Sequence, residues 1–121
     1  MKTEKRSLYE GLYILRATLS DSARQQAHRK IISLIESLGG THEKTIDWGR
    51  RKMAYRIKGN GEGHYYLIYF SQPTESIYEL IRENRLNEDL LRFMNVLIEK
   101  VPEADQITFK QIVEVERERE R

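Results

Sequence analysis

The side chains best suited to chemistry in this 121-residue chain are cations gathered in one short segment. Residues 50–58 have a net charge of +5 because they contain no acid and five cations: Arg50, Arg51, Lys52, Arg56 and Lys58. The whole chain has a net charge of only +2, so its positive charge is concentrated. Arginine can hold a phosphate through two parallel hydrogen bonds, and lysine adds a mobile point charge. The segment therefore predicts a phosphate-binding surface, with a merely solvated strand face as the alternative.

Two further features support nucleic acid as the ligand. Lys5 and Arg6 add a second, shorter basic segment near the start of the chain. Tyr13 and Tyr65 lie on the two strands where an RNA-recognition module places its base-stacking aromatics. A free-standing module for single-stranded RNA is therefore an alternative function, although neighbouring aromatic residues could equally belong to the core.

No pattern in the sequence favours catalysis. There is no nucleophile in a recognisable setting and no cysteine, and the three histidines lack the spacing of a zinc-binding helix. The glycines at 59, 61 and 63 sit in a predicted hairpin and not before a helix that could hold phosphate. No apolar run approaches the roughly 20 residues that cross a bilayer. We expect a soluble cytoplasmic protein that is not an enzyme and has no metal, cofactor, membrane or small-molecule substrate.

The elements that must position the cations follow the order β-α-β-β-α-β. Strands are expected at 8–18, 41–58, 64–71 and 90–100, and helices at 21–38 and from 74 to about 85. Gly49 predicts a bulge in the second strand, and residues 59–61 predict its hairpin turn. The order predicts an α+β, ferredoxin-like split βαβ fold. Its four-stranded antiparallel sheet would have the order 4-1-3-2, with both helices on one face.

The last part of the chain has a different composition. The 33% of charged residues is high for a packed domain, and the sequence ends in strictly alternating Glu and Arg. We expect a folded domain over residues 1–101 and a charged, flexible tail over 102–121. The apolar residues Ile107, Phe109 and Ile112 are too few to fold alone.

The basic segment also carries a resemblance to a known family. The run from Asp47 to Ile57, with Leu8-Tyr9-Glu10 and the segment from Arg85 to Met94, resembles bacterial small-subunit ribosomal protein six. The resemblance covers about residues 7–100. Met53 and Arg56 depart from the family, which usually has Leu and Pro there. Exchanging Leu for Met conserves volume, whereas Arg56 adds a charge and an amide donor.

The resemblance implies a structural constituent of the bacterial small ribosomal subunit that binds the central domain of its rRNA. It also implies a heterodimer with ribosomal protein eighteen, and it adds Arg85 and Arg92 to the candidate RNA-binding residues. Trp48, Tyr13 and Tyr65 are the candidates for contact with that partner, because aromatic side chains left on an open sheet face can be buried by a second chain.

Overall fold

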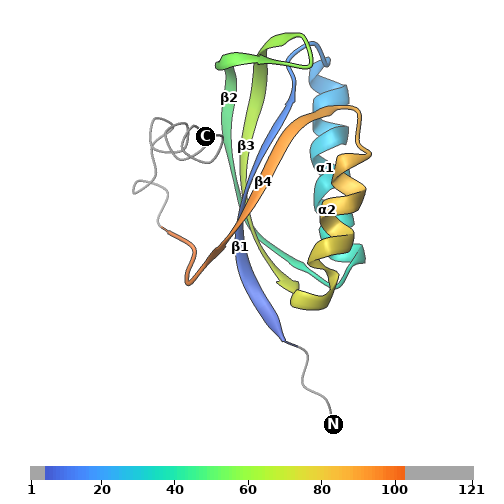
Figure 1. Cartoon of the computed structure of the whole chain (residues 1–121), viewed down its shortest axis with the longest axis vertical. Coiled ribbons are helices and arrows are strands. Elements are labelled where there is room, and N and C mark those ends of the chain that lie inside the picture. Colours follow the sequence, from blue (N-terminus) through green and yellow to red (C-terminus); the bar gives the residue numbers. More distant parts are fainter. Residues whose placement is uncertain (1–4, 103–121) are drawn as a thin grey trace.

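The computed structural model describes residues 5–102, so most of the predicted tail lies outside the described residues. The elements are β1 (Arg6–Arg16), α1 (Asp21–Ser37), β2 (Thr41–Ile57), β3 (Asn60–Pro73), a short 3-10 turn η1 (Thr74–Ser76), α2 (Ile77–Arg85) and β4 (Leu90–Ile98). All strand pairs are antiparallel, in the order β2-β3-β1-β4. The predicted fold is confirmed (Figure 1).

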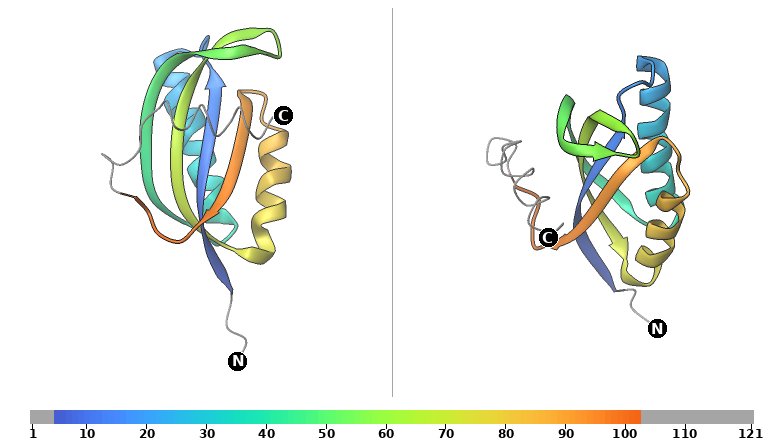
Figure 2. Two further views of the ribbon diagram at one scale, coloured as in Figure 1. Left: turned by 60° about the vertical axis from the view of Figure 1, so that its left-hand side comes forward. Right: turned by 45° about the horizontal axis from the view of Figure 1, so that its top comes forward.

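Both helices pack on one face of the sheet, which Figure 2 shows in its left view with the strands in front. The core on that face joins Ile31 and Ile35 of α1 and Leu80 of α2 to aromatic residues of β1 and β3. These positions recur at helical spacing in α1, and burying them drives the helix onto the sheet. Ser20 caps α1 by accepting a hydrogen bond from the Ala23 amide at 3.1 Å.

The boundaries of the second half differ from the sequence prediction. Thr74 opens a 3-10 turn and does not cap an α-helix, since α2 starts only at Ile77. Strand β4 ends at Ile98, two residues before the predicted end. Neither difference changes the order or direction of the elements.

A second, smaller cluster lies on the sheet face opposite the helices. Leu12, Ile14, Tyr65 and Leu91 are buried there, and Trp48, Met53 and Ile57 pack against them. The last three residues come from the long end of β2, so the β2–β3 hairpin covers one end of the open face. The predicted bulge at Gly49 is confirmed, since the pairing of β2 with β3 shifts between Asp47 and Gly49, whose φ is +78°.

Candidate nucleic-acid interface

The turn of the β2–β3 hairpin places one lysine at the end of the molecule. Ile57 pairs with Asn60, so the turn residues are Lys58 and Gly59, with φ values of 51° and 82°. This is one residue earlier than the sequence predicted. Two positive φ values match the twist of a tight hairpin. The Asn60 side chain supports the turn by donating to the Lys58 carbonyl oxygen at 3.0 Å.

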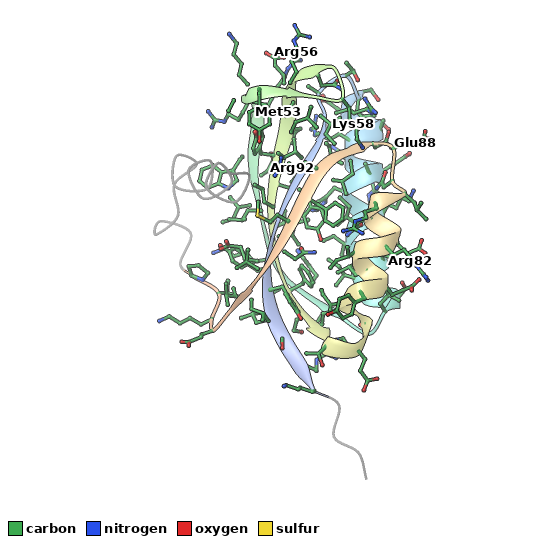
Figure 3. The ribbon with its side chains drawn as sticks, viewed as in Figure 1. Met53, Arg56, Lys58, Arg82, Glu88 and Arg92 are labelled. Atoms are coloured by element: carbon green, nitrogen blue, oxygen red, sulfur yellow. The ribbon has the colours of Figure 1, made fainter. Side chains whose placement is uncertain are left out.

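Three predicted RNA-binding cations from three different elements meet around one hollow. Lys58 comes from the hairpin turn, Arg85 from the end of α2 and Arg92 from β4, and all three line the same depression. No acidic residue is among its described lining residues. The guanidinium of Arg92 donates to the Tyr55 hydroxyl at 3.4 Å, which links β4 to the hairpin. Figure 3 shows Arg56 at the upper tip of the molecule, with Lys58 and then Arg92 below it in the upper half.

The other cations of the basic segment differ in their partners. Arg50 is paired with Glu62 of β3, and its Nε lies 2.8 Å from the carboxylate. Arg51 donates to the Trp48 carbonyl oxygen at 3.0 Å, and Arg56 donates to that of Gly59 at 3.2 Å. Lys52 is exposed directly across from Glu62. A segment free of acids in the sequence thus gains an acid from the facing strand, and Arg50 is the cation most neutralised by it.

The two basic residues near the start of the chain lie at the other end of the sheet. Arg6 pairs with Pro73 at one end of β3, whereas the hairpin turn lies just before Asn60 at the other end of that strand (Figure 1). The Arg6 guanidinium donates to the Gly39 carbonyl oxygen at 2.8 Å and to the hydroxyls of Thr41 and Ser71. The structure therefore makes Arg6 a link between β1 and the start of β2. Lys5 beside it is exposed and also far from the hollow.

The aromatic candidates need correction. Tyr13 is 0% exposed and lies in the core on the helix side, so its ring cannot meet a base or a partner chain. Tyr65 does lie on the opposite face, but it is 2% exposed because the hairpin end covers it. Base stacking on the open face requires exposed rings, and these two tyrosines do not supply them. Trp48 is only half-buried and keeps part of its side chain at the surface.

Histidines form a cluster that the sequence analysis missed. His28 of α1 stacks on the Tyr66 ring at a centroid distance of 4.7 Å, and His64 of β3 packs against the same ring in a tilted arrangement at 4.9 Å. His28 and His42 both contact the Thr45 hydroxyl. Their positions share no local spacing, so only the tertiary fold brings them together. In residues 5–102, no group of three or more His, Asp or Glu side chains could hold a metal ion.

Comparisons with known proteins show the family to which the chain belongs. The family model described as ribosomal protein S6 matches residues 8–96. The chain belongs to the ribosomal protein S6 family. The small ribosomal subunit protein bS6 of Chlamydia trachomatis serovar D is 50% identical over 104 residues, covering 86% of this chain and 93% of its own. The bS6 protein of Protochlamydia amoebophila is 44% identical over 114 residues, covering 94% of this chain and 98% of its own.

A solved structure of the family supports the fold. The crystal structure of 30S ribosomal protein S6 from Thermotoga maritima matches with a TM-score of 0.73 at 24% identity, over 97% of this chain and 100% of its own. Membership of the S6 family makes this chain a structural protein of the bacterial small ribosomal subunit, located in the cytoplasmic ribosome. It is therefore not an enzyme. Among residues 5–102, no helix is long and apolar enough to cross a bilayer.

Proposed function

We propose that this protein binds the central domain of small-subunit rRNA through one end of its sheet, together with ribosomal protein eighteen. The observation that carries the proposal is the convergence of Lys58, Arg85 and Arg92 around a hollow without acids. We call these three, with the exposed hairpin cations Arg51, Lys52 and Arg56, the basic end.

The chemistry of the basic end suits the RNA backbone better than a particular base sequence. Its cations come from β2, the hairpin turn, α2 and β4, so their spacing is fixed by the sheet and not by a flexible segment. A rigid set of cations loses less conformational entropy on binding than a disordered one. Contacts to phosphate set position and orientation on RNA but carry no base specificity.

The need for a partner follows from the size of this footprint. Six cations supply only a few phosphate contacts, which at physiological salt give a dissociation constant of roughly 10⁻⁴ to 10⁻⁶ M. Specific assembly requires an affinity roughly a thousandfold higher. A second basic chain would extend the positive surface. The open face offers it Met94, Val96 and Ile98 of β4, all half-buried, and part of Trp48.

The partner is tested by titrating central-domain rRNA with this protein in the presence and absence of ribosomal protein eighteen. We expect weak binding by the protein alone and a gain of at least a hundredfold with the partner. Nanomolar binding by this protein alone, unchanged by the partner, would contradict the heterodimer.

The phosphate contacts are tested by the salt dependence of binding. Arg85→Gln and Lys58→Gln should each lower the slope of log K against log salt by about 0.7–0.9, because one phosphate contact is lost. Arg82→Gln is the matched control, since Arg82 is exposed on the same helix, pairs with Glu79 and does not line the hollow (Figure 3). If all three variants keep the slope of the original protein, Lys58 and Arg85 do not contact phosphate and face solvent or a protein partner instead.

A further inference from the structure

The hollow beside β4 combines two kinds of lining that a nucleotide needs. Lys58, Arg85 and Arg92 provide positive charge, while Ile81 of α2 and Leu90 and Phe93 of β4 provide apolar wall. We infer that the hollow receives a single unpaired nucleotide of the RNA, with its base against the apolar wall and its phosphate among the cations. This inference rests on the proposed binding of rRNA and adds which part of the RNA enters the protein.

The wall of the hollow also carries amide groups that can read a base edge. Asn84 and Asn95 both line it. The Tyr13 hydroxyl donates to Asn95 Oδ1 at 3.1 Å and accepts from Asn84 Nδ2 at 3.4 Å. Burial raises the pKa of Tyr13 far above its usual range, so the hydroxyl stays protonated and holds the Asn95 amide in one orientation.

That orientation leaves one donor without a partner. Asn95 Nδ2 is buried, and no acceptor within residues 5–102 bonds to it. A buried donor without an acceptor is destabilising, so a base that displaces the side chains covering Asn95 Nδ2 and offers it an acceptor atom gains affinity. Every nucleobase carries ring-nitrogen or carbonyl acceptors on its edges, whereas a phosphate held at the cations need not reach this far.

The position of the hollow explains why the nucleotide should be unpaired. It lies between α2 and β4, an edge strand that pairs only with β1 in the described sheet. Bases within an RNA duplex are stacked inside it, and the deep major groove is too narrow for side chains to read. Bases in loops and bulges can leave the stack and enter a protein hollow. Duplex RNA would meet only the cations.

The first test uses NMR of the full chain with two probes, adenosine 5′-monophosphate and inorganic phosphate. We expect the nucleotide to shift the backbone amide signals of residues 90–95 and the side-chain amide of Asn95. Inorganic phosphate alone should leave the Asn95 side-chain signal in place. The same set of shifts from both probes would show an anion site without a base site and would overturn the inference.

The second test fills the hollow. Ile81→Phe adds volume to the apolar wall, and we expect it to abolish the nucleotide shifts and weaken rRNA binding, with the partner present, about tenfold. Tyr78→Ala is the control on the same helix, because Tyr78 is 79% exposed and does not line the hollow. Its affinity should stay within twofold of the original.

These outcomes separate the inference from the function on which it rests. If the Ile81→Phe variant binds rRNA as tightly as the original protein, the hollow does not take a base, although the rRNA interface stands. If neither protein binds rRNA even with the partner, the proposed function itself fails. The unfolding midpoint of Ile81→Phe is measured alongside; should the variant not fold, the comparison of the two NMR probes on the original protein decides.

Discussion

Tyr13 offers a sharp test of the distinction between core and binding surface. Its ring is fully buried and stacks on Phe93 at a centroid distance of 6.0 Å. Its hydroxyl lies between the side chains of Asn84, which is 2% exposed, and Asn95. The change Tyr13→Phe keeps the ring and its packing but removes both hydrogen bonds. It should therefore lower stability, and the Asn84 and Asn95 amides at the hollow are its only route to RNA binding among the described residues.

The expected loss can be worked out from these contacts. Without the hydroxyl, the buried Asn84 amide loses one acceptor and the Asn95 oxygen loses its donor. A buried polar group left without its partner costs about 1–3 kcal/mol. We expect the free energy of unfolding to fall by about 2 kcal/mol. For a domain of roughly 100 residues, each kcal/mol lowers the melting temperature by about 4–8 °C.

The assay is urea unfolding followed by rRNA titration with the partner present. Tyr55→Phe is the matched control, because Tyr55 is 46% exposed and, within residues 5–102, its hydroxyl accepts one long hydrogen bond from Arg92. That variant should lose less than about 0.5 kcal/mol. Tyr13→Phe should keep the salt dependence of rRNA binding wherever it is folded, because no phosphate contact is lost, and freeing the Asn95 amide at the hollow should weaken its affinity less than Ile81→Phe does. A variant with unchanged stability but weakened binding would refute the reasoning and bring back Tyr13 as an RNA contact.

Three other outcomes are expected. Arg6→Gln should lower the free energy of unfolding, measured by urea titration, by about 1 kcal/mol, because the variant loses the hydrogen bond to the Gly39 carbonyl oxygen. If the variant instead shows a flatter salt dependence of rRNA binding, Arg6 is a phosphate contact. Burial and the nearby charge of His42 lower the pKa of His28, so the unfolded chain binds that proton more tightly than the folded one. The free energy of unfolding should thus fall as the pH drops below about 6.5, and His28→Gln should flatten this dependence in thermal melts across pH 5–8. Truncation after Lys100 should leave the unfolding midpoint nearly unchanged, and a loss above about 2 kcal/mol would place the tail's apolar residues in the core.

Local chemistry explains which parts of the fold were predictable. The spacing of Ile31 and Ile35, with the cap at Ser20, defines α1 within one residue of the prediction at its C-terminal end. Gly49 predicted its bulge because few other residues adopt a positive φ without strain. The hairpin turn was placed one residue too late, because Lys58 itself takes a positive φ in the structure. Side-chain statistics disfavour that conformation for lysine, and only the register of β2 against β3 imposes it.

The candidate site was predictable in its residue types but not in its grouping. The sequence shows a dense run of cations at 50–58, and Lys58, Arg85 and Arg92 were all among its candidates. It could not show that these three surround one hollow, since they are up to 34 positions apart and meet only when α2 packs beside β4. Nor could it show that Glu62 neutralises Arg50, which depends on strand pairing.

The orientation of the two central strands also separates what the sequence determines from what the tertiary structure decides. By itself the sequence determined that β1 and β3 are central, because apolar residues on both parities require burial on both sides. Tyr13 and Tyr65 looked equivalent in that pattern, yet they lie on opposite faces, one against the helices and one under the hairpin. Tertiary structure alone decided this, because a strand buried on both faces has no polar side to fix its orientation. The choice is made by the residues that cover each face, and these come from distant parts of the chain.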